Sequence, residues 1–170
     1  MSNIIILSLE FSMRKIHFKK LMAALVLPQL AGSLGAIFTR ESVETWYQQL
    51  IKPSLNPPSW VFAPVWTTLF LLMGFAFYLV WVSPQDNARR KTGLSLFCLH
   101  LGVNTLWSFL FFGLQSPFWA FMDIIVLWIM ITLLVRIFWS LDLWAGVMLV
   151  PYLLWVSFAA FLNYEIWRMN

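Results

Sequence analysis

Charged residues are scarce in this chain. Of its 170 residues, 11% carry a charge and 61% are apolar. A soluble domain has about a quarter charged residues, which keep its surface hydrated, so this composition argues against a soluble protein. We therefore attribute the net charge of +4 to orientation in a membrane rather than to nucleic-acid binding.

Residues for common catalytic chemistry are also few. The one cysteine, Cys98, lies in an apolar run and excludes both an internal disulfide and a cysteine-based metal cluster. His17 and His100 are too far apart to form a metal pair. The sequence has no Ser-His-Asp arrangement, no paired carboxylates and no glycine-rich phosphate loop. A hydrolase or metalloenzyme is therefore unsupported, and we expect no metal site and no required cofactor.

Long apolar runs are what the chain has instead. About 20 helical residues cross the ~30 Å hydrocarbon core of a bilayer, and runs of about 18 or more indicate a spanning helix. The sequence predicts five such spans, at about residues 21–38, 60–82, 92–113, 117–139 and 141–167. We therefore predict an all-α integral membrane bundle of five transmembrane helices. It forms one domain, residues 21–170, after a basic extension, residues 1–20, in which Met13 is an alternative start to Met1.

Lysine and arginine predict the orientation of the spans. Cytoplasmic loops carry an excess of these residues. One side of the predicted bundle has Arg14, Lys15, Lys19, Lys20, Arg89, Arg90, Lys91 and Arg136, whereas the other has Arg40, Lys52 and Arg168. This bias places the N-terminus in the cytoplasm and the loop between the first two spans outside, and favours a bacterial inner membrane.

A cleaved signal peptide is the alternative for the first span. The stretch from Met13 has a basic region, an apolar region and small residues, as signal peptides do, and cleavage would leave four spans. Two features argue against it. The apolar run is long for a signal core, and the pairs Ala31/Gly35 and Gly32/Ala36 suit close packing between membrane helices.

Polar residues inside predicted spans are the first candidates for function, because burying them in lipid is costly. They are His100, Asn104, Asp123 and Asn163. Asp123 fits a proton or ion site, but a hydrogen bond between packed helices is the favoured interpretation. For His100, a hydrogen-bonding role is favoured over ligation of haem iron.

Helical spacing groups further candidates on three faces. His100, Asn104 and Trp107 lie at i, i+4 and i+7 of the third span. The same spacing joins Phe62, Trp66 and Leu69 in the second span and Trp155, Ala159 and Leu162 in the fifth. If these faces converge, they enclose a flat, aromatic-walled cavity for a planar apolar ligand. Ordinary helix packing produces such stripes as well.

The segment 162–168, "LNYEIWR", matches a pattern proposed for sterol contact. Leu162, Tyr164 and Arg168 occupy the defining positions. The pattern occurs often by chance. Tyr164, Trp167 and Arg168 would serve equally as an anchor at the membrane interface.

A loop with unusual composition joins the first two spans. The stretch "WYQQLIKPSLNPPSWVFAPVW", Trp46 to Trp66, holds four prolines and three tryptophans. It resembles the signature of the tryptophan-rich sensory protein / translocator protein family (TspO, also called the peripheral-type benzodiazepine receptor family). The resemblance continues through "PQLAGSLGA", "LGVNTLWSFLFFG", "FWAFMDIIV" and "PYLLWVSFAAFLNYEIWR", in order, from about Pro28 to Asn170.

The resemblance implies an aromatic cavity that binds tetrapyrroles such as protoporphyrin IX, or sterol-like planar molecules, for their transport or sensing. It implies a homodimer in a lipid bilayer and a loop, residues 46–66, that covers the site. The implied ligand-binding residues are Phe62, Ala63, Trp66, Asn104, Trp107, Trp155, Ala159 and Leu162. His100 is a further candidate and departs from the glutamine usual in the family, so haem remains a minor ligand option.

An enzymatic role is the alternative function that the resemblance carries. Some members of the family degrade protoporphyrin IX in light, and the indoles that correspond to that chemistry here are Trp66 and Trp155. The sequence supplies these rings but does not show turnover. A third possibility is a structural membrane partner with an incidental cavity.

Overall fold

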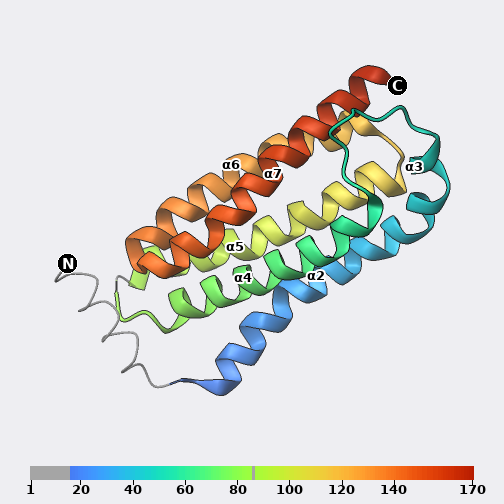
Figure 1. Cartoon of the computed structure of the whole chain (residues 1–170). Helices are drawn as coiled ribbons and strands as arrows, with labels where there is room; N and C mark the ends of the chain where they lie inside the picture. Colours follow the sequence, from blue (N-terminus) through green and yellow to red (C-terminus); the bar gives the residue numbers. More distant parts are fainter. Residues whose placement is uncertain (1–15, 86) are drawn as a thin grey trace.

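Helices form the regular structure of the part of the chain that the computed structural model describes, residues 16–85 and 87–170. In order, they are α2 (Phe18–Glu44), α3 (Trp46–Gln49), the 3₁₀ turn η1 (Ser59–Val61), α4 (Phe62–Val82), α5 (Asn87–Ser108), the π-helical segment η2 (Phe109–Gly113), α6 (Pro117–Leu141) and α7 (Leu143–Met169). Five of these stretches are long and apolar enough to cross a membrane, which confirms the predicted all-α bundle. They run side by side along one long axis (Figure 1).

The first helix is longer than predicted at both ends. It begins at Phe18, so Lys19 and Lys20 lie in its first turn, and the Lys20 ammonium lies 5.4 Å from the centre of the Trp81 ring. It continues to Glu44 because no glycine or proline interrupts residues 39–44, although the apolar run ends near Phe38. Residues 1–15, which make up most of the predicted basic extension, lie outside the described part of the chain.

Proline and aspartate mark two other helix ends. Pro117 is the first residue of α6, as the sequence predicted, where the missing N–H is not needed. The preceding Ser116 makes no side-chain capping bond within the described structure. At the start of α7, the Asp142 carboxylate accepts hydrogen bonds from the backbone N–H groups of Trp144 (3.0 Å) and Ala145 (3.2 Å).

Glycines bring α2 close to α4. A Cβ atom on Gly74 would lie 2.8 Å from both the carbonyl oxygen of Ala24 and the Cα of Leu25, so the two backbones are in near contact here. Further along α2, a Cβ on Gly32 would meet the Phe70 ring at 2.2 Å. Gly32, one of the small residues whose spacing predicted close packing, therefore lies directly against α4, whereas the backbone contact at Gly74 lies outside the predicted pairs.

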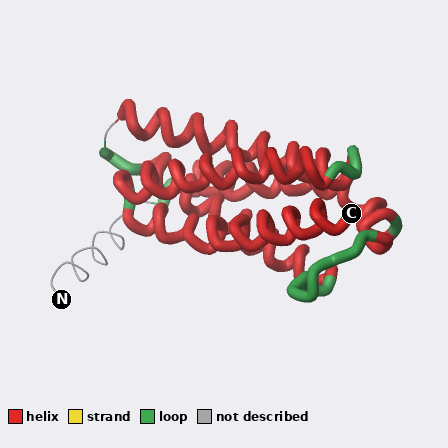
Figure 2. The backbone as a smooth tube through the Cα atoms, turned by 90° about the horizontal axis from the view of Figure 1, so that it is seen from above, coloured by secondary structure: helices red, strands yellow, loops and turns green. Residues whose placement is uncertain are grey.

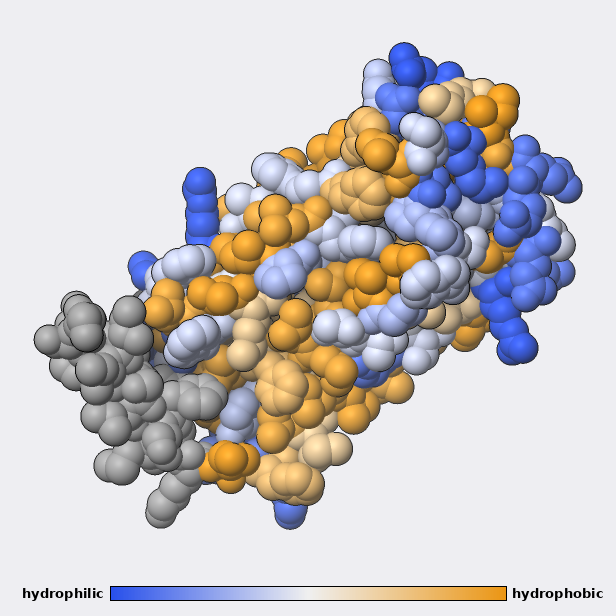
Figure 3. All heavy atoms as spheres, in the orientation of Figure 1, coloured by the Kyte–Doolittle hydropathy of each residue, from blue (hydrophilic) through white to orange (hydrophobic). Residues whose placement is uncertain are grey.

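Apolar side chains fill the interior between α4, α5, α6 and α7. Met73, Phe97, Phe138 and Tyr152 are fully buried in one continuous apolar cluster. In space-filling form, apolar side chains cover much of the visible flank, and hydrophilic residues gather at the end that carries α3 (Figure 3). The loop between α3 and η1 lies at that same end, beside the end of α7 (Figure 2).

Candidate ligand cavity

A cavity of about 470 Å³ lies between α2, α4, α5 and α7, at the end of the bundle that carries α3. This volume is in the range of sites for small organic ligands, which run from about 300 to 1,000 Å³. Most of its lining is apolar, with a few polar groups from α2, α5 and the loop. The three predicted helix faces do converge, and they leave a void between them.

The residues that the sequence singled out are brought together here. Eight of the nine predicted ligand-binding residues line the cavity: Phe62, Ala63, Trp66, Asn104, Trp107, Trp155, Ala159 and Leu162. Three indoles, those of Trp66, Trp107 and Trp155, face this void. Trp128 instead lies on the outside of the bundle, 39% exposed, where its Nε1–H donates to Ser157 Oγ at 2.8 Å.

His100 does not line the cavity. Tyr152 from α7 contacts His100 on one hand and the cavity-lining residues Asn104 and Trp66 on the other. The Asn104 amide donates to the Tyr152 hydroxyl at 3.1 Å, and the His100 ring packs edge-on against the Tyr152 ring. His100 Nδ1 lies 2.6 Å from the carbonyl oxygen of Phe97, and Nε2 has no hydrogen-bond partner among the described residues. This arrangement separates His100 from any molecule in the cavity.

The three indoles of the wall are held differently. Trp107 stacks on Phe111 with ring centres 5.2 Å apart, and its Nε1–H donates to Asn163 Oδ1 at 3.0 Å. Trp155 packs edge-on against Phe62, with 6.0 Å between ring centres. Its Nε1–H has no partner in the described structure, so it is a donor that a ligand acceptor would satisfy. Trp66 packs against Phe70 and Tyr152, with 5.4 and 6.2 Å between ring centres.

The roof comes from α3 and the loop after it. Tyr47 and Asn56 both line the cavity, and the Tyr47 hydroxyl donates to Asn56 Oδ1 at 2.8 Å. Burial raises the pKa of the Tyr47 phenol above its ordinary value, outweighing the lowering by the Asn56 bond, so the hydroxyl remains a donor at neutral pH. Lys52 does not face the void, because its ammonium donates to the carbonyls of Gln48 and Leu50 and lies over the Tyr47 ring.

One wall was not predicted. Helix α2 contributes Gly35, Ala36 and Arg40 among other residues, and η2 contributes Phe111 and Phe112. The small residues of α2 had been interpreted only as a packing surface, although a small side chain also leaves room for a ligand. The wide π-helical turn of η2 is a feature frequently found at functional sites, but its sequence, "FLFFG", is typical of an ordinary membrane helix.

The residues of the sterol-contact pattern do not form one surface. Leu162 is buried and faces the cavity, whereas Tyr164 packs against Phe121 and Trp167 on the outside of α7. Arg168 forms an exposed ion pair with Glu165 at 2.9 Å. Tyr164 and Arg168 therefore lie on the outside of α7, away from the cavity that Leu162 faces. Asp123 is buried on α6, and its Oδ2 has no hydrogen-bond partner among the described residues.

The fold and the cavity together define a multi-pass helical membrane protein with an aromatic intramembrane void. The profile of the TspO/MBR family matches residues 24–168. The chain is 43% identical over 139 residues to a tryptophan-rich protein TspO of Chlorobaculum tepidum, covering 82% of this chain and 88% of that one. It is 40% identical over 151 residues to a tryptophan-rich protein TspO of Archaeoglobus fulgidus, covering 89% and 97%. It is 36% identical over 146 residues to the translocator protein of Bos taurus, covering 85% and 86%. The chain therefore belongs to the TspO/MBR family.

Proposed function

We propose that the protein binds tetrapyrroles of the protoporphyrin IX type, or sterol-like planar molecules, in the cavity and acts in their transport or sensing. The observation that carries this proposal is the void of about 470 Å³ walled by Trp66, Trp107 and Trp155 from three helices. Indole rings offer large flat surfaces for stacking on an apolar macrocycle. The name of the bovine relative, translocator protein, is consistent with transport.

Arg40 favours a ligand that carries an acidic group. It lies at the edge of the cavity and is exposed, and its guanidinium has no hydrogen bond or ion pair to another described residue. A propionate of a bound porphyrin would be a suitable partner, since guanidinium groups match carboxylate geometry. Lys52, a cation of the loop between the first two spans, is already occupied by backbone carbonyls and the Tyr47 ring.

The test of binding is a porphyrin titration of the purified protein, followed by the shift of the porphyrin absorption band. We expect Trp66→Ala and Trp107→Ala each to raise the Kd by about tenfold or more, because losing one aromatic contact and its buried area removes ~1.4 kcal/mol or more. Trp128→Ala is the matched control, because it removes the same side chain from the outer surface. Equal affinities in all three variants and the unmodified protein would exclude binding in this cavity.

The role of Arg40 has its own test. Arg40→Gln should weaken protoporphyrin IX binding by about threefold at low salt, the size expected of a solvent-exposed ion pair, and less at high salt. Protoporphyrin IX dimethyl ester has no propionate charge and should bind both proteins equally. A matching loss of affinity for the ester would indicate that the substitution changes the cavity rather than a charge contact.

Light-dependent breakdown of the bound porphyrin is the second candidate function. It is favoured by one observation, that Trp66 and Trp155 line the same cavity. Illumination in air, with dioxygen as the oxidant, should then bleach the porphyrin band and give a new product, and Trp66→Phe and Trp155→Phe should slow this. We further propose that the protein acts as a homodimer in a bacterial inner membrane. Crosslinking in native membranes would test the homodimer.

A further inference from the structure

The end of α7 is bonded to the loop that roofs the cavity. The Asn170 side-chain carbonyl accepts from the backbone N–H of Ile51 at 3.0 Å, and the Asn170 side-chain NH₂ donates to the Ile51 carbonyl at 3.0 Å. We infer that Asn170 is a positioning residue that latches the loop of residues 50–58 over the cavity. For its effect on a ligand, this inference rests on the proposed function.

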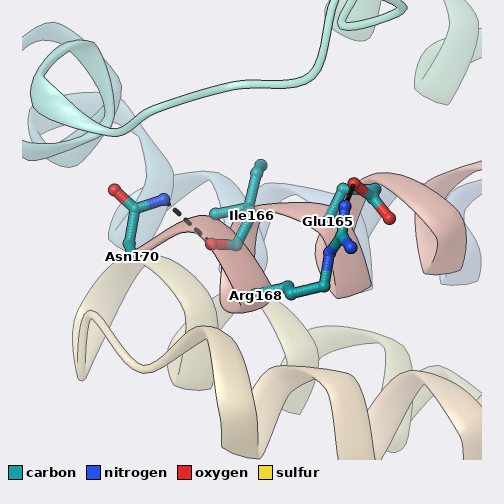
Figure 4. Close-up of polar contacts among 4 residues, drawn as sticks. All are labelled: Glu165, Ile166, Arg168 and Asn170. Carbon is teal, nitrogen blue, oxygen red and sulfur yellow. Dashed lines mark hydrogen bonds and ion pairs between the residues drawn. The ribbon is translucent and has the colours of Figure 1, made fainter.

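The two bonds fix the Asn170 amide in one orientation. The Ile51 N–H needs an acceptor and the Ile51 carbonyl needs a donor, so a flipped amide would satisfy neither. The same NH₂ also donates to the Ile166 carbonyl at 2.8 Å, which holds the side chain against the last turn of α7 (Figure 4). The amide thus pairs with Ile51 as a neighbouring β-strand residue would.

Short, stiff connections carry this restraint from Ile51 to the cavity roof. Two residues after Ile51, a turn begins in which the Asn56 N–H donates to the Pro53 carbonyl at 2.9 Å. Prolines at 53, 57 and 58 restrict the backbone around the turn. Asn56 then accepts the Tyr47 hydroxyl bond, and both residues line the cavity.

The other end of the latch is anchored in packed structure. Ile166, one turn before Asn170, is buried, lines the cavity and packs in one cluster with Tyr47, Phe111 and Ala120. Its carbonyl is the third partner of the Asn170 amide. Position 170 is therefore held relative to the cavity wall, and Asn170 in turn holds the loop. A ligand that enters under this loop has to wait for these bonds to open.

The latch is tested first without ligand, by residue-resolved hydrogen exchange on the full-length protein. Asn170→Leu removes both bonds to Ile51, and the Ile51 amide should exchange about 30-fold faster, the factor that corresponds to two hydrogen bonds worth about 1 kcal/mol each. Asn170→Asp keeps an acceptor for the Ile51 N–H, so its exchange should rise less. Both variants lose the bond to Ile166, so fraying of α7 alone would affect them equally.

Arg168→Ala is the matched control at the same helix end. It removes the ion pair with Glu165 (Figure 4), and neither side chain is hydrogen-bonded to the loop in the described structure. Ile51 exchange should not change in this variant. An Asn170→Leu protein whose Ile51 amide exchanges as slowly as that of the unmodified protein would overturn the latch.

Protoporphyrin IX binding kinetics then test what the latch does. Asn170→Leu should raise both the association and the dissociation rate several-fold, with a smaller change in Kd, because opening of the loop limits both steps. If exchange rises but both rates stay unchanged, the loop does not gate the cavity and that part of the inference fails. If the unmodified protein binds no porphyrin, the proposed function fails, and the exchange measurement alone decides whether the latch exists.

Discussion

Ala159→Phe should abolish porphyrin binding, with a Kd raised by about 100-fold or more. Ala159 lies one turn after Trp155 on α7 and lines the cavity. A phenyl ring at this position would occupy the space between the walls that carry Trp155 and Trp107. A rigid macrocycle cannot fold around this ring, and steric exclusion of this kind costs more than the loss of any single contact, ~3 kcal/mol for a 100-fold change.

The same substitution should leave the protein folded. The new ring enters an existing void rather than a filled core, so its burial offsets the strain, and the midpoint of thermal unfolding in detergent should stay the same or rise. Leu154→Phe places the same ring on α7 at a side chain that is 65% exposed, and it should change neither affinity nor stability. A folded Ala159→Phe protein that binds porphyrin with normal affinity would show that the ligand lies elsewhere.

Much of the fold follows from the sequence for a simple reason. In a bilayer every backbone polar group needs an internal partner, so an apolar run of sufficient length has to be helical. The helix ends depend on weaker effects. The end of the apolar run near Phe38 predicts only where lipid contact stops. The helix α2 itself continues to Glu44 and ends at Thr45.

The cavity was predictable in part, because side chains at i, i+4 and i+7 share a face wherever the helix lies. That periodicity places Asn104 and Trp107 together, but it carries no information on depth. His100 shares their face, yet it lies under Tyr152, a residue from another helix. The wall from α2 was missed for the same reason, since only the packed bundle shows which small residues face a void.

Gly74→Ala should destabilise the bundle, because α2 and α4 meet there backbone to backbone. The added methyl group would lie 2.8 Å from the Ala24 carbonyl oxygen and the Leu25 Cα, so one helix has to move. Overpacking of this kind costs about 1–3 kcal/mol, which exceeds the ~1 kcal/mol that alanine gains over glycine in a helix. We expect a lower midpoint of thermal unfolding in detergent, and weaker porphyrin binding because α2 forms a wall of the cavity.

Gly102→Ala on α5 is the matched control, since a Cβ at this position meets no described atom within 4 Å beyond its chain neighbours and the backbone of its own helix. The two variants make the same chemical change inside spanning helices, so helix propensity acts equally on both and only the contact between α2 and α4 differs. Gly102→Ala should be neutral or slightly stabilising. Equal midpoints in the two variants would mean that α2 adjusts its position at little cost, and the wall it contributes would then be adaptable rather than fixed by its contact with α4.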